Sequence, residues 1–224
     1  MCLAEVAPDF YLDEEESGLG AEPGMVRAFM CFADRVSPSM TQYDWDAVEG
    51  HTSVAYIITP VLTRETAVAH SRTLLQLVGV LFERCGAVAI KNESSGIAHG
   101  RERWLEYVEL NCSDDPKVFG LALYKAWVRR PLRHAHMVYS CGMHLLGHPD
   151  IELESGDAAE AVAWIELLGL TMVALQPTRP LLDGEGIRNE GGERRVMQRT
   201  KCQRHPADNL FFNPYGYIRL GPLT

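Results

Sequence analysis

Alternating and periodic apolar positions in the first half of the chain predict a strand–helix–strand unit. The run at 53–59 (SVAYIIT) is short, β-branched and followed by Pro60, as is typical of a central strand. After Thr63, the expected N-cap, the apolar residues recur at helical spacing until Gly86: Ala67, Leu74, Leu75, Val78, Leu81 and Phe82. The run at 87–92 (AVAIKN) then predicts a second strand. Such a unit is a βαβ crossover, in which we expect the two strands to be parallel.

Further apolar runs predict more strands on both sides of this unit. They are residues 25–32 (MVRAFMCF), 121–130, 136–146, 151–154, 181–182, 194–201 and 217–220. Residues 93–100 are polar and predict a loop after the third strand. Short helices are expected at 37–50 and 101–110.

A second long helix is predicted from Ala158 to Leu175, with Asp157 as its N-cap. Its apolar face consists of Ala161, Trp164, Ile165, Leu168 and Met172. These elements together predict an α+β fold, with a mixed β-sheet that contains the βαβ crossover and is covered by two long helices.

Charge divides the chain into an acidic N-terminal segment, residues 1–24, and a single α+β domain, residues 25–224. The segment holds seven acidic residues and no Lys or Arg, whereas the net charge of the whole chain is −9. A second, basic block near the C-terminus contains six basic and two acidic residues between Arg188 and Arg204. The two could pair within one molecule or across a homodimer, and the sequence leaves both arrangements open.

Composition excludes several classes of protein. Hydrophobic residues make up 46% and charged residues 23% of the 224, which is typical of a globular protein rather than a disordered one. The six cysteines are scattered without a CxxC pair, and the N-terminus lacks the basic and apolar regions of a signal peptide. We therefore expect reduced thiols, a cytoplasmic location and no membrane-spanning helix.

The acidic balance indicates a basic protein partner and argues against nucleic acid, because like charges repel. The acidic residues Asp13, Glu14, Glu15 and Glu16 are candidate contacts. A second candidate set, Glu93, Ser94, Ser95 and His99, follows the third strand of the crossover, where ligands often bind in α/β proteins. The same polar residues could instead cap the helix that follows.

The sequence also contains residues that are typical of two other kinds of site, a zinc site and a hydrolase active site. The histidines His134, His136, His144 and His148, with Cys141 among them, could hold zinc in a stabilised scaffold. However, only His144 and His148 have a zinc-knuckle spacing, so we expect no metal and no cofactor. Enzymatic activity is the other alternative: a small-molecule hydrolase could use Glu93 and His99, with Cys112 as a nucleophile, although no GxSxG motif is present.

Two stretches resemble the DUF4261 family of bacterial proteins, whose biochemistry is unassigned. The resemblance covers roughly residues 55–187 and is most specific in the second stretch, where a strand ends in Gly-Met and Leu-Gly-x-Pro-Asp-Ile-Glu follows. The matching positions are Gly142, Met143, Leu146, Gly147, Pro149, Asp150, Ile151 and Glu152. The family supplies no catalytic residue to transfer. It implies a place near bacterial toxin systems, and hence an immunity protein that neutralises a secreted effector by direct binding.

Overall fold

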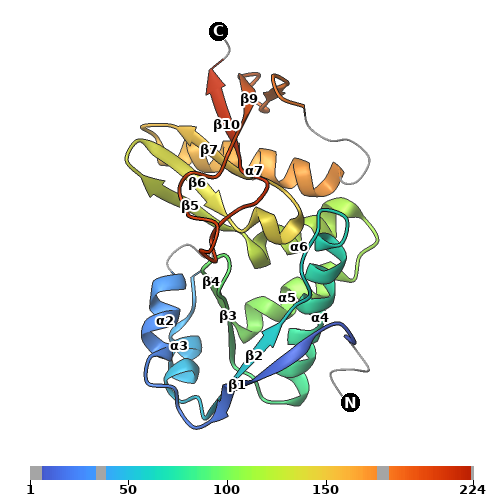
Figure 1. Ribbon diagram of the computed structural model, residues 1–224, viewed down its shortest axis with the longest axis vertical. Coiled ribbons are helices and arrows are strands. Elements are labelled where there is room, and N and C mark those ends of the chain that lie inside the picture. Colours follow the sequence, from blue (N-terminus) through green and yellow to red (C-terminus); the bar gives the residue numbers. More distant parts are fainter. Residues whose placement is uncertain (1–6, 34–38, 176–181, 223–224) are drawn as a thin grey trace.

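The computed structural model describes residues 7–33, 39–175 and 182–222 and has an α+β fold, which confirms the predicted class. Figure 1 shows an elongated molecule with the N-terminal elements at one end and the C-terminal sheet at the other. In chain order the elements are β1 (Tyr11–Leu19), α2 (Met25–Phe32), α3 (Gln42–Glu49), β2 (Ser53–Ile58), α4 (Ala67–Arg84), β3 (Ala89–Asn92), β4 (Ile97–Gly100), α5 (Arg101–Asn111), α6 (Pro116–Trp127), β5 (Arg129–His134), β6 (Met137–Cys141), the 3₁₀ helix η1 (Met143–Leu146), β7 (Asp150–Glu154), α7 (Ala158–Leu175), β8 (Gly186–Arg188), β9 (Arg194–Thr200) and β10 (Tyr217–Pro222).

A six-stranded mixed sheet forms the C-terminal end, in the order β5-β6-β7-β10-β9-β8. The pair β7–β10 is parallel and the other pairs are antiparallel. Because side chains alternate along a strand, β7 and β10 bury one face, with Ile151, Leu153, Ile218 and Leu220 in the core beside α7. The strands predicted at 151–154, 194–201 and 217–220 are confirmed, whereas Leu181 lies outside the described residues.

Helices α4, α5, α6 and α7 share one hydrophobic core with this sheet. The indoles of Trp104, Trp127 and Trp164 are almost completely buried in it. The apolar face predicted for α7 is the buried one, and Asp157 caps the helix by accepting the Ala159 N–H at 2.8 Å. Among the described residues, α7 alone has the length and hydropathy that could cross a membrane; the sequence analysis missed this because Glu160 and Glu166 interrupt the apolar run.

The N-terminal end is built from two separate two-stranded sheets and the helices α2 and α3. Strand β1 pairs with β2 and strand β3 with β4, each in antiparallel register. Helices α2 and α3 pack together over a small second core that includes Met25, Phe29 and Val48, with Val54 of β2 and Ala89 of β3 at its edges. The acidic N-terminal segment therefore contributes a paired strand to this end.

Two predicted strands are helices in the structure. Residues 25–32 form α2, and most of 121–130 belongs to α6. A short apolar run fits a buried helix as well as a buried strand, so periodicity cannot separate them. In α6 the stronger signal lies just upstream, where Asp115 accepts the Lys117 N–H at 2.9 Å and Pro116 occupies the first turn.

The predicted crossover pairing is also wrong. Strands β2 and β3 exist, but they belong to different sheets and no strand pairing joins them; the parallel pair of this fold is β7–β10. The segment 93–100, predicted as a loop, is a tight turn followed by the buried strand β4. Strand pairing depends on contacts far apart in sequence, which local patterns do not encode.

A buried carboxylate organises the link between β6, η1 and β7. Asp150 is fully buried and accepts hydrogen bonds from Ser140 Oγ (3.0 Å), the Met143 N–H (3.2 Å) and Asn213 Nδ2 (2.7 Å). Burial raises the pKa of Asp150 to about 6, and these hydrogen bonds oppose the rise. The network thus ties the C-terminal loop, through Asn213, to the centre of the sheet.

Removing this carboxylate is expected to be costly. In Asp150→Ala three buried donors lose their acceptor, so the free energy of unfolding should fall by about 2–4 kcal/mol. Urea unfolding followed by circular dichroism measures the loss. Asp208→Ala, which removes an exposed carboxylate, is the matched control and should change stability by less than about 0.5 kcal/mol. Equal stability of the two variants would contradict the network's role.

Gly142, the first glycine of the DUF4261-like motif, is required by backbone geometry. Its φ is +117°, and a Cβ there would collide with the Trp127 carbonyl oxygen and lie 2.8 Å from the Ser95 Cβ. We expect Gly142→Ala to lower stability by at least about 2 kcal/mol. Gly156→Ala is the control, because no atom lies within 4 Å of its Cβ position. Thermal unfolding of both variants tests this, and a small effect at Gly142 would refute it.

Candidate functional site

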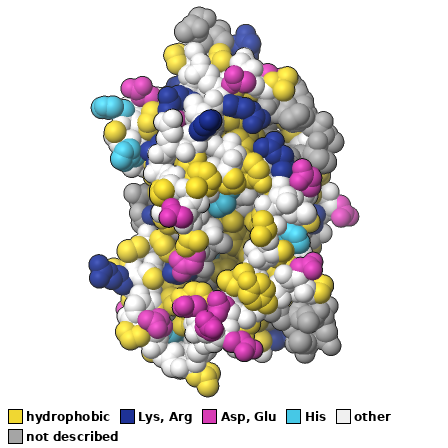
Figure 2. All heavy atoms as spheres, in the orientation of Figure 1, with side chains coloured by type: hydrophobic (Ala, Val, Ile, Leu, Met, Phe, Trp, Pro, Cys, Tyr) yellow, Lys and Arg dark blue, Asp and Glu magenta, His cyan; other side chains and the backbone are white. Residues whose placement is uncertain are grey.

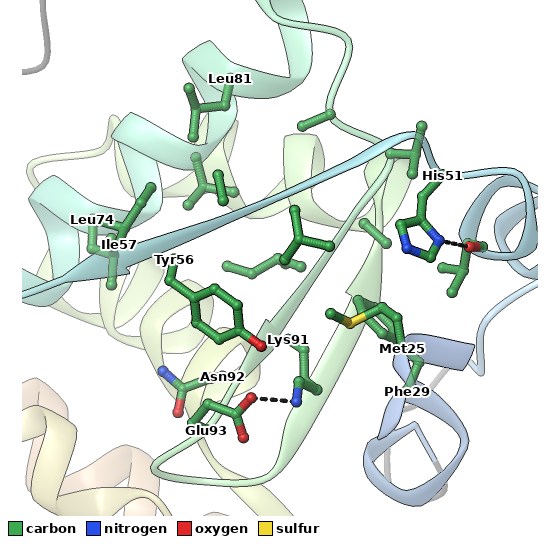
Figure 3. A pocket seen from close by; sticks show the side chains of 18 of the residues that line it. Met25, Phe29, His51, Tyr56, Ile57, Leu74, Leu81, Lys91, Asn92 and Glu93 are labelled. Atoms are coloured by element: carbon green, nitrogen blue, oxygen red, sulfur yellow. Dashed lines mark hydrogen bonds and ion pairs between the residues drawn. The ribbon is translucent and has the colours of Figure 1, made fainter. Parts of the chain in front are cut away.

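A cavity of about 700 Å³ lies between strands β2 and β3. Apolar side chains of α4 and α2 line it, among them Leu74, Leu81, Met25 and Phe29 (Figure 3). Its volume is within the range of ordinary ligand pockets, roughly 300–1,000 Å³. Of the residues singled out from the sequence, Glu93 and Ser94 line this cavity, whereas its apolar walls on α2 and α4 were not predicted as a site.

The cavity follows strand edges rather than one face of a sheet. Every residue from Gly50 to Thr59 and from Cys85 to Ser94 lines it. Side chains alternate between the two faces of a strand, so a cavity on one face would be lined by every second residue. Continuous lining on both sides shows that the backbones of β2 and β3 border the cavity.

Polar groups gather at one end of the cavity (Figure 3). The Lys91 ammonium forms an ion pair with Glu93, and the Tyr56 phenol lies beside them. The pKa of Tyr56 is raised, first by burial and then by the charges of Glu93, Glu16 and Glu22. Carboxylates from the N-terminal segment and from the turn after β3 therefore raise the pKa of the same phenol. We call this polar end of the cavity, at Tyr56, Lys91 and Glu93, its mouth.

His51 anchors the acidic turn at the other end. Its Nδ1 lies 2.6 Å from the Val48 carbonyl oxygen, and its Nε2 lies 2.8 Å from the Glu22 backbone nitrogen. The Glu22 N–H is a donor, so Nε2 accepts and Nδ1–H donates, which defines a neutral tautomer. His51 thus joins the turn before α2 to the end of α3.

The acidic excess of the sequence falls in its first 58 residues. Residues 1–58 contain 11 acidic and two basic residues, a balance of −9, and residues 59–224 contain 19 of each. Figure 2 shows acidic side chains gathered over the lower, N-terminal end and basic ones over the upper end. The acidic and basic blocks therefore lie at opposite ends of one molecule and do not neutralise each other within it.

The structure brings together part of the predicted contact set. Asp13, Glu14, Glu15 and Glu16 lie on β1, at an irregularity in its pairing with β2, and the last three are exposed. Asp13 Oδ1 accepts the backbone N–H groups of Glu15 (3.1 Å) and Glu16 (3.2 Å). Glu93 and Ser94, from the second predicted set, line the cavity.

Ser95 and His99 are interior residues, which corrects their predicted role as contacts. Ser95 Oγ donates to Asn92 Oδ1 at 3.0 Å and is completely buried. His99 lies in β4, where its Nε2 is 3.1 Å from the Ala126 carbonyl oxygen and its ring packs between Trp104 and Tyr107. His99 faces the core because the second half of the predicted loop is the buried strand β4, and Ser95 is buried in the tight turn before it.

The four histidines do not converge. His134 and His136 are exposed at the β5–β6 turn, whereas His148 is buried and His144 half-buried beyond β6. Across residues 7–33, 39–175 and 182–222, no group of three or more metal-ligating side chains has a geometry that could hold an ion. Nor does the part of the chain described contain a disulfide among its five cysteines.

A polar cluster that sequence analysis missed lies on the opposite face of the sheet from α7. The buried Glu152 carboxylate pairs with Arg204 (2.9 Å) and Arg219 (2.6 Å). Arg204 also stacks over Tyr139, 4.0 Å from the ring centre. Both oxygens of the carboxylate are engaged by arginines, so this cluster fastens the C-terminal loop to β7.

Acid should destabilise the protein through its buried histidines. Burial lowers the pKa of His99, His144 and His148 to about 4, from 6.5. The unfolded chain then binds more protons between pH 6.5 and 4, so stability is present above pH 6.5 and is lost as pH falls. For one fully buried histidine the loss is at most about 3 kcal/mol. His99→Gln should reduce this pH dependence and exposed His134→Gln should not, as urea unfolding at several pH values will test.

Comparisons with known proteins give no information about this site. No family model matches this chain, and no curated protein or solved structure matches it either. The likeness to the DUF4261 family therefore rests on the residues quoted above and stays a prediction.

Proposed function

We propose that the protein is a non-enzymatic binding protein that captures a basic protein partner at its acidic end. The observation that supports this most is the joint position of charge and cavity: the whole net charge of −9 lies in residues 1–58, and carboxylates of this segment and of Glu93 act on the cavity mouth. A field of one sign around a recess draws oppositely charged partners and orients them.

Exposed apolar side chains at the same end support a macromolecular partner. Six of the eight large hydrophobic residues that are exposed in the described chain precede residue 62: Tyr11, Leu12, Leu19, Met30, Tyr43 and Val61. Protein interfaces combine apolar and aromatic anchors with a charged rim. Acidic groups on β1 and apolar groups beside them have this composition.

In its most specific form, the protein is an immunity protein that acts in the cytoplasm and neutralises a secreted bacterial effector by direct binding. The DUF4261-like residues suggest this setting, and tight neutralisation benefits from fast, charge-steered encounter. The hydrolase alternative has less support, because Glu93 lines the cavity while His99 faces Ala126 in the core. A zinc scaffold has no converging ligands among the described residues.

Reversing the acidic charges should weaken capture. We expect the triple variant Glu14→Lys, Glu15→Lys, Glu16→Lys to bind the product of an adjacent effector gene about 10- to 100-fold more weakly at low salt, because each reversal removes attraction and adds repulsion. Biolayer interferometry at low and high salt measures the change, and the difference should shrink at high salt.

A matched control carries the same change of charge on another surface. Glu102→Lys, Glu109→Lys, Asp114→Lys replaces exposed carboxylates on and just after α5 and should weaken binding by less than about threefold. Equal weakening by both triple variants would mean that net charge alone, and not the acidic end, attracts the partner. Failure of the wild-type protein to bind any adjacent gene product would overturn the proposed function.

A further inference from the structure

Within the part of the chain that the structure describes, β2 and β3 each have one edge without a partner strand, and both strands border the same cavity. Strand β2 pairs with β1 along one side, and β3 pairs with β4 along one side. Between them lies the cavity that every residue from Gly50 to Thr59 and from Cys85 to Ser94 lines. Figure 1 shows the two strands spreading apart from the lower end of the molecule, so the gap widens toward Tyr56 and Glu93.

The direction of the backbone groups on β2 follows from one hydrogen bond. The Tyr56 N–H donates to Ser17 Oγ at 2.9 Å, on the β1 side. Successive backbone groups point to opposite edges of a strand, so Ala55 and Ile57 direct their N–H and C=O groups toward the cavity. An unpaired strand edge of this kind is a template for an additional strand.

We propose that an extended segment of the basic partner enters this gap as an additional strand between β2 and β3. This inference rests on the proposed function and names its binding mode. One inserted strand would pair with the free edge of β2 and extend the two-stranded β1–β2 sheet by a third strand, while β3 borders the other side of the gap. Adding a strand to an exposed edge is an established mode of peptide recognition.

The lining specifies the chemistry of the inserted segment. Six residues of β2 and four of β3 border the gap, so the segment pairs over about four to six residues. One face of it would meet the apolar floor of α4, which includes Leu74, Val78 and Leu81, and its end beside Tyr56 would meet the carboxylates of the mouth. β-Branched residues facing α4 match the floor, and basic residues alternating with them match the acidic charge, since side chains alternate along a strand.

The alternating peptide KVKVKVK is the first probe. We expect its fluorescein-labelled form to bind the full-length protein, and the acidic peptide EVEVEVE to bind at least about tenfold more weakly, because of the carboxylates at the mouth. Amide hydrogen exchange measured by NMR should show new protection at Ala55 and Ile57 when the basic peptide binds. Absence of binding, or binding without protection of these two amides, overturns strand insertion.

A backbone variant separates pairing from charge. Ala55→Pro removes one cavity-facing N–H without changing any charge, whereas Ala55→Ser keeps the N–H and a small side chain. We expect the proline variant to bind KVKVKVK about tenfold more weakly than the serine variant, with thermal unfolding checking that both fold. If Ala55→Pro fails to fold, the exchange of the Ile57 amide in the wild-type protein decides instead.

The outcome also separates this inference from the function on which it rests. Weaker partner binding by the Glu14/Glu15/Glu16 triple variant, together with equal binding by Ala55→Pro and Ala55→Ser, would overturn strand insertion and keep capture at the acidic end. Loss of partner binding in Ala55→Pro alone would support insertion. If a fatty acid displaces KVKVKVK from the cavity while Ala55 and Ile57 stay unprotected, the site takes a lipid and not a strand.

Discussion

The missing hydrogen bonds between β2 and β3 are the constraint on which the site depends. Backbone N–H and C=O groups at a partly buried edge need partners, because an unmade hydrogen bond there costs free energy. Had the two strands paired, as a crossover would require, the space between them would be filled. Their separation creates the 700 Å³ cavity and leaves an edge of β2 at which a further strand can pair.

The distribution of charge determines which end of the molecule attracts a basic partner. The acidic residues of β1 and the neighbouring turn lie beside the open edge of β2, while the basic strand β9 lies at the far end of the molecule (Figure 1). Because opposite charges are kept apart, the molecule presents two surfaces of opposite sign. An extended basic segment would be attracted to the acidic end before any hydrogen bond forms. Charge would then speed the association, and backbone hydrogen bonding would make it specific.

The rigid part of the molecule lies elsewhere. Asp150 and Glu152, on the same face of β7, hold the C-terminal loop through Asn213 and Arg204, and the other face of the strand packs with Ile151 and Leu153 into the main core. A sheet fixed on both faces has little freedom to accept a new strand. The two small N-terminal sheets, which have a small core of their own, are the part of the molecule where a bound segment can add a strand.

Local sequence determined the elements with strong periodicity or a clear cap: α4 and α7, β2, β7, β9 and β10, and the acidic character of the N-terminal segment. The sequence also singled out Gly142 as part of a motif. The positive φ of this residue explains why a glycine is needed there. Only the tertiary structure decided that 25–32 and 121–130 are helical, that His99 is interior, and that β2 and β3 stay apart. These outcomes depend on contacts between segments that are far apart in the sequence. Burial and strand pairing are decided by such contacts and not by the residues of one segment alone.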